Sequence, residues 1–224
     1  MRTYFTIIKY LQETLLTISI IVMMALPTML VFNKDIITLD VISQLYLISH
    51  YLLLFVMIIR PLSDIFTKAI WIRPLVILRK GAGVLSASIV VSFILAKLMV
   101  DPASYFGSMA TFKYWSLENY ALFAHFADLS AVILIVTSNN LSKRIFGNWW
   151  KKIQKLSYVY FYGSVIYLFF NYGGIDLLIS LILVTMLTYI AYIKNKKRLA
   201  HVPTIIPVEN KENIIKKLYE YKKI

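Results

Sequence analysis

The feature that most constrains this chain is a series of long apolar runs separated by short polar stretches. A helix needs about 20 apolar residues to cross a bilayer, and it satisfies its own backbone hydrogen bonds there. The pattern therefore predicts an all-α polytopic membrane protein, a bundle of six transmembrane helices. The runs cover residues 14–32, 41–60, 81–99, 117–138, 156–171 and 174–194.

Composition agrees with a membrane protein and removes several kinds of chemistry. Of the 224 residues, 59% are hydrophobic, whereas soluble domains contain about 45–50% apolar residues. The absence of cysteine excludes disulfides and thiolate metal sites. Three histidines, none at metal-ligand spacing from another ligand, predict no metal site.

The basic residues are confined to one set of the polar stretches. The N-terminus, residues 60–80, residues 139–155 and the tail from Lys194 hold 21 of the 24 Lys and Arg residues. Because basic residues accumulate in loops that are not translocated, this pattern predicts both termini on the cytoplasmic or matrix side. It also accounts for the net charge of +13 without a nucleic-acid partner. The predicted location is a bacterial cytoplasmic membrane or a mitochondrial inner membrane.

Two domains are predicted: a transmembrane domain over 1–198 and a basic tail over 199–224, with a short amphipathic helix from Asn210. The 61–78 segment is too apolar for an ordinary loop, so Ile65, Ile70, Trp71 and Ile72 are expected along the membrane interface. Residues 171–174, Asn-Tyr-Gly-Gly, predict a tight turn between the last two helices.

Several landmarks recur in a recognisable order over residues 60–170. Together they resemble the ferric reductase-like transmembrane domain family, and within it the haem-binding membrane subunit of the periplasmic methionine sulfoxide reductase. The landmarks are Arg60-Pro61-Leu62, Leu78-Arg79-Lys80-Gly81-Ala82-Gly83, Thr137-Ser138, Ser142-Lys143-Arg144 and Trp149-Trp150-Lys151-Lys152.

The resemblance implies b-type haem held by histidines between the third and fifth helices, and electron transfer across the membrane. At the family's ligand positions, however, this chain carries Phe93, Gln154 and Tyr167. Phe and Gln do not ligate haem iron, and one Tyr facing a Phe would be an unusual site. We therefore expect no cofactor, with Phe93 and Tyr167 filling the space that a lost haem would leave. The small residues of the third helix, Gly81, Gly83, Ser86, Ser88 and Ser92, are expected to let neighbouring helices approach closely.

Three ionisable groups lie within the predicted spans. His50 is midway along the second span, and His125 and Asp128 share one face of the fourth. Such groups are costly in a bilayer and need a partner or water. They could form a proton path, a quinone-binding pair or an improvised haem site. Alternatively, they form a hydrogen-bonded cluster that braces the helices or contacts another subunit, which is the interpretation we favour.

The function predicted from these observations is that of a haem-less accessory subunit, not an enzyme, whose partners are other membrane subunits and the lipid bilayer. A respiratory or electron-transfer complex is the expected host, by analogy with the family. The alternative is an electron-transfer subunit that binds haem b or a quinone through His50 and His125, and that passes electrons to a separate reductase.

Overall fold

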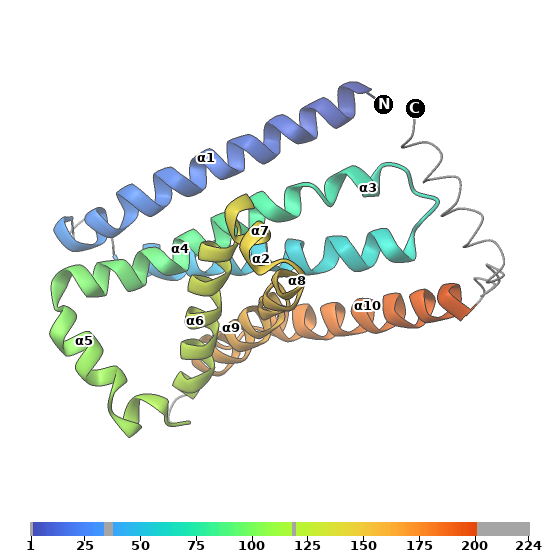
Figure 1. The fold of residues 1–224 in the computed structure, drawn as a ribbon. Helices are drawn as coiled ribbons and strands as arrows, with labels where there is room; N and C mark the ends of the chain where they lie inside the picture. The colour runs from blue at the N-terminus through green and yellow to red at the C-terminus, as the bar shows by residue number, and fades with distance from the viewer. Residues whose placement is uncertain (1, 34–37, 118–119, 201–224) are drawn as a thin grey trace, which may run out of the picture. The chain divides into compact units, whose positions relative to one another are not determined.

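The computed structural model describes residues 2–33, 38–117 and 120–200, and their regular structure is helical throughout (Figure 1). The chain divides into two units, Met1–Ala191 and Tyr192–Ile224, and the contacts discussed below belong to the first. The tail helix expected from Asn210 lies outside the described residues. The helices are α1 (Arg2–Phe32), α2 (Leu39–Ile65), α3 (Ile72–Leu75), α4 (Leu78–Val100), α5 (Pro102–Met109), η1 (Phe112–Trp115), α6 (Ala121–Thr137), α7 (Asn140–Phe146), α8 (Asn148–Ile153), α9 (Leu156–Tyr172) and α10 (Ile175–Ala200).

Long apolar helices make this an integral membrane protein with four or five candidate spans among its described residues. α1, α2, α10 and the stretch Ile72–Val100 are each long and apolar enough to cross a membrane. α6 qualifies only together with α7, from which it is bent by 96°. α9 has 17 residues, or about 26 Å of helix against a hydrocarbon core of about 30 Å. Helix length and composition alone therefore do not establish six spans.

The segments between the apolar runs carry more helix than the sequence predicts. α2 continues through Pro61 to Ile65, and residues 139–155 form the short helices α7 and α8. The expectation that Ile72 lies along the membrane interface is wrong, because only 5% of this side chain is exposed. The short helix α3 begins at Ile72 and contacts α1, α2 and α4, which cover it. Its neighbours Ile70 and Trp71 are exposed, as expected.

The predicted turn between the last two helices is confirmed. α9 ends at Tyr172 and α10 begins at Ile175. The φ angles of Gly173 and Gly174 are +68° and +114°. L-residues with a side chain rarely adopt such angles, so this connection requires glycine.

Helix α4 packs against α1, α2 and α6 (Figure 1). The closest approach is at Gly81, whose backbone N–H donates to Gln12 Oε1 of α1 at 3.0 Å. A Cβ atom added at Gly81 would lie 2.9 Å from the Cβ of Leu15, so no larger residue fits unless α1 moves. The expected role of small residues in this helix is confirmed at this position.

Helices α6 and α9 meet in the same way. A Cβ atom at Gly163 of α9 would lie 2.7 Å from the carbonyl oxygen of Phe123 and 3.2 Å from the Cβ of Ala127. Ala127 and Ala131 of α6 are almost fully buried. The close α6–α9 contact therefore also depends on small side chains.

Replacing Gly81 with Val should push α1 away from α4 and destabilise the protein by about 1–3 kcal/mol, the usual range for overpacking. Thermal unfolding of the purified chain in detergent measures this as a lower midpoint. Gly107→Val is the matched control, because a Cβ at Gly107 meets nothing within 4 Å. Equal midpoints for the two variants would contradict the close contact.

Candidate functional site

Three buried hydroxyl groups join α2, α4 and α9. Ser49 Oγ lies 3.0 Å from Ser86 Oγ and 3.0 Å from the Tyr160 hydroxyl, and the Ser86–Tyr160 distance is also 3.0 Å. Ser86 also donates to the backbone oxygen of Ser49 at 2.9 Å. All three residues are at most 3% exposed. In this triangle, here called the hydroxyl cluster, the three hydroxyl groups bond one another and so fix the register of three helices.

A cavity of about 130 Å³ adjoins the hydroxyl cluster, lined by residues from α2, α4, α6 and α9. We call it the polar cavity. Its lining includes four residues singled out from the sequence, His50, His125, Asp128 and Tyr167. The structure thus brings together two groups of residues that the sequence analysis treated separately.

The His50 ring is held by contacts with α9 and α10. Its Nε2 lies 3.3 Å from Ser180 Oγ of α10, and its plane stacks on Phe161 of α9 at 5.6 Å between centroids. Its Nδ1 is buried and has no hydrogen-bond partner among the described residues. The neighbouring Tyr51 hydroxyl donates to Asp176 Oδ2 at 2.9 Å, so adjacent residues of α2 both contact α10.

His125 and Asp128 contribute to the cavity from α6. The His125 ring stacks on Tyr114 of η1, with 3.6 Å between centroids, so the segment before α6 folds back over this face. Burial raises the pKa of Tyr114 above its usual range. Lys97 of α4 lines the same cavity as Asp128, which places an opposite charge near the carboxylate.

The three haem-ligand positions implied by the resemblance fall in two places. Phe93 is 7% exposed and stacks on Tyr46 at 4.5 Å between centroids. Tyr46 and Tyr167 line the polar cavity, whereas Gln154 lines a second, larger pocket. Gln154 Nε2 donates to Thr137 Oγ1 at 3.5 Å.

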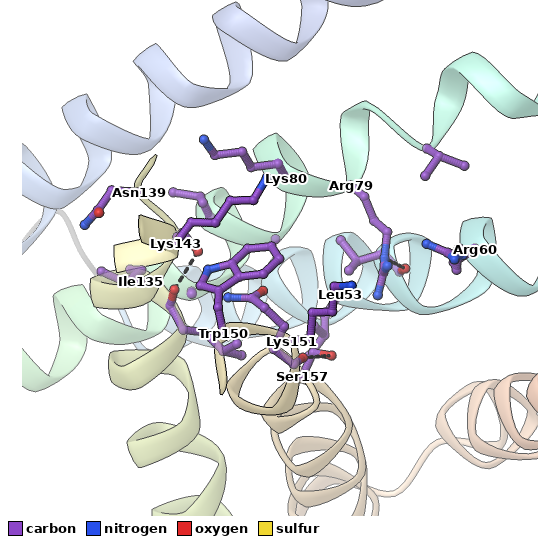
Figure 2. A pocket seen from close by; sticks show the side chains of 18 of the residues that line it. Leu53, Arg60, Arg79, Lys80, Ile135, Asn139, Lys143, Trp150, Lys151 and Ser157 are labelled. Atoms are coloured by element: carbon purple, nitrogen blue, oxygen red, sulfur yellow. Dashed lines mark hydrogen bonds between the residues drawn. The ribbon is translucent and has the colours of Figure 1, made fainter. Parts of the chain in front are cut away.

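The second pocket has a volume of about 460 Å³ and is strongly cationic (Figure 2). We call it the basic pocket. Its apolar lining includes Leu53 and Val56 of α2 and Leu134 and Ile135 of α6, and no Asp or Glu of the described residues lines it. Its basic residues come from four helices and are Arg60, Arg79, Lys80, Lys143 and Lys151.

Specific contacts hold the walls of the basic pocket. Arg79 Nε donates to the backbone oxygen of Val56 at 3.0 Å, which ties α4 to α2. The Trp150 indole N–H donates to the backbone oxygen of Thr137 at 2.9 Å, which ties α8 to the end of α6. The ammonium of Lys143 lies 5.7 Å from the Trp150 ring centroid, within cation–π range. Figure 2 shows Lys143 and Lys80 above this indole, and Arg79 and Arg60 to its right.

The two cavities occupy opposite halves of the same four helices. The polar cavity is lined by Tyr46, Lys97 and Ala121, whereas the basic pocket is lined by Arg79 and residues near the C-terminal end of α6. Leu53 lines both cavities and is 2% exposed. At this point the two cavities are therefore separated by a single side chain, that of Leu53.

The sequence analysis did not single out Ser49, Tyr46, Lys97 or Tyr160 as parts of these sites. The sequence has 16 tyrosines, so one hydroxyl that bonds in the core carries no distinctive signal. Lys97 did carry one, because it is the only basic residue within the predicted 81–99 run.

Comparison with known proteins gives no relative for this chain: no protein-family model matches it, and neither a curated protein nor a solved structure does.

Removing the Tyr160 hydroxyl should destabilise the bundle by about 0.6 kcal/mol, and at most by about 1.7, as found for hydrogen bonds between membrane helices. The variant is Tyr160→Phe, and its thermal unfolding midpoint in detergent is the measurement. Tyr162→Phe is a matched control on the same helix, because its hydroxyl bonds Thr185 at an exposed position. A larger drop in the unfolding midpoint for Tyr162→Phe than for Tyr160→Phe would contradict the role of the hydroxyl cluster.

Proposed function

We propose that this chain is a haem-less accessory subunit of a larger membrane complex. The observation that carries the proposal is the Tyr46–Phe93 stack, in which the buried Phe93, covered by the half-buried Tyr46, occupies a position where the resembled family places a haem ligand. Interiors are close-packed, so a lost cofactor has to be replaced by side chains of similar bulk. The proposed role is to supply helices and contact surfaces, with no redox step of its own.

The residues at the former ligand positions do not fit a haem. Phe93 has no donor atom, and the Gln154 amide is bonded to Thr137. The polar cavity beside Tyr167 measures about 130 Å³, whereas sites for small molecules and cofactors measure about 300–1,000 Å³. The small volume disfavours haem in the polar cavity alone, because the basic pocket beside Gln154 measures about 460 Å³. At Phe93 and Gln154 it is the donor chemistry that disfavours haem.

The proposed topology has six spans with both termini on the cytoplasmic or matrix side. The charge distribution supports it, since residues 60–80 and 139–155 carry ten of the basic residues. α6 and α9 have 17 residues each, at the short end of the range that spans a bilayer. The membrane is proposed to be a bacterial cytoplasmic or mitochondrial inner membrane, and the host a respiratory or electron-transfer complex.

A second candidate function is electron transfer with haem b or a quinone bound through His50 and His125. The observation in its favour is that both rings line the polar cavity. Against it, the His50 ring is stacked on Phe161, and the His125 ring on Tyr114. A ligand between them would have to displace these contacts.

Purification in mild detergent tests the accessory role. We expect the tagged chain to copurify with other membrane proteins in fixed proportion, and to show no reducible b-type haem band in its visible spectrum after dithionite. A stable monomer that copurifies with nothing would contradict the proposal. A reducible haem band lost in both His50→Ala and His125→Ala would establish the second candidate.

Substitutions of Asp128 distinguish a structural role, in which it braces the helices, from a role in proton transfer. Asp128→Asn keeps the shape and hydrogen-bonding capacity, so assembly and activity of the host complex should survive. Asp128→Leu should weaken assembly by about 1–3 kcal/mol, because it leaves a polar partner unpaired. The yield of assembled complex and its turnover are the measurements. An Asn variant that assembles fully and has no turnover would instead indicate proton relay, since an amide cannot exchange a proton in that role.

A further inference from the structure

The basic pocket brings like charges together, and no Asp or Glu among the described residues lines it. The nearest counter-charge is Asp64, whose Oδ2 lies 3.5 Å from Arg60 Nε and leaves Arg79, Lys80, Lys143 and Lys151 without an acidic partner in the lining. Arg60, Arg79, Lys80, Lys143 and Lys151 line one concave site. Like charges in a partly desolvated site repel one another more strongly than they do in water. A bound anion would relieve this repulsion, so the pocket has the electrostatics of an anion site.

Arg79 is positioned for such an anion. Its Nε is already bonded to the Val56 backbone oxygen, which fixes the guanidinium on the wall between α2 and α4. Its terminal nitrogens make no hydrogen bond with the described residues, and Arg79 is one of the residues that line the pocket. A guanidinium fixed in this way favours a phosphate, because its paired N–H groups match two phosphate oxygens.

The remainder of the lining favours an amphiphile over a free ion. Leu53, Val56, Leu134 and Ile135 supply apolar surface next to the basic side chains. Trp150 is anchored beside them, and Trp is the residue typical of the headgroup level of a membrane. A phosphate attached to acyl chains satisfies both parts of this lining, and basic pockets between membrane helices are known to hold anionic lipid headgroups.

We propose that the basic pocket binds the phosphate headgroup of an anionic membrane phospholipid, with Arg79, Lys143 and Lys151 as its principal contacts. The proposal depends on membrane insertion alone and is independent of the accessory role, so either can fail without the other.

The test uses the full chain purified in dodecyl maltoside at fixed ionic strength. Phosphatidylglycerol, phosphatidylcholine with the same acyl chains, and sodium phosphate are added separately. Binding is measured by native mass spectrometry and by the shift of the thermal unfolding midpoint. We expect phosphatidylglycerol to be retained and to raise the midpoint, and the other two to have little effect.

A matched pair of double variants locates the site. Lys143→Gln with Lys151→Gln removes two charges that line the pocket, whereas Arg144→Gln with Lys152→Gln removes two charges from the same helices at positions outside its lining. Because only the first pair removes charges that line the pocket, we expect about a tenfold or greater loss of phosphatidylglycerol affinity in the first pair and less than about twofold in the second.

Three outcomes would overturn the proposal. Equal binding of phosphatidylcholine would indicate an apolar lipid contact with no headgroup recognition. An equal effect of sodium phosphate would indicate a site for a soluble anion. Equal losses in the two double variants would indicate general attraction by a basic surface. The lipid comparison on the unmodified chain decides the first two outcomes even if a variant fails to fold.

Discussion

Helix α4 can contact α1, α2 and α6 at once because its inward positions carry small side chains. Because Gly81 has no side chain, α1 contacts the α4 backbone at this position. Ser86 lies close enough to α2 and α9 to form hydrogen bonds with Ser49 and Tyr160. Hydrophobic burial does not drive helix association inside a bilayer, where lipid is as apolar as a leucine side chain. Close approach and buried hydroxyl contacts therefore hold this bundle together, and both cavities depend on the helix spacing that they set.

The helical architecture could be predicted well from the sequence, because an apolar run of about 20 residues in a membrane protein almost always forms a helix. The end of α6 was less predictable. The apolar sequence continues without interruption to Ser138 and gives no sign of a bend, whereas the chain bends by 96° between α6 and α7. The hydroxyl cluster could not be predicted, since its formation depends on the relative register of α2, α4 and α9. The sequence analysis grouped His50 with His125 and Asp128, and all three line one cavity. Ionisable side chains in apolar helices usually face the interior of the bundle or a cavity, which is why this grouping was possible from sequence.

The basic residues of segments 60–80 and 139–155 illustrate how one sequence signal can carry two kinds of information. Read along the chain, they are topology signals, as lysine and arginine are in most membrane proteins. In the folded protein, five of them surround a single pocket. No linear pattern distinguishes charges that face a shared pocket from those that face solvent. Lys143 and Arg144 are neighbours in the sequence, yet only Lys143 lines the pocket.

The thin partition at Leu53 has an electrical consequence. A cavity of even a few tens of Å³ with polar walls can hold water, and water carries the surrounding potential inward because it is so much more polarisable than protein. If both cavities hold water and each opens to its own side of the bilayer, the electric field across the membrane falls mainly across the layer containing Leu53. A charge that crosses this layer would experience most of the membrane voltage, worth about 2.3 kcal/mol per elementary charge at 100 mV. Asp128 and Arg79, which line different chambers, would then stand on opposite sides of that voltage drop.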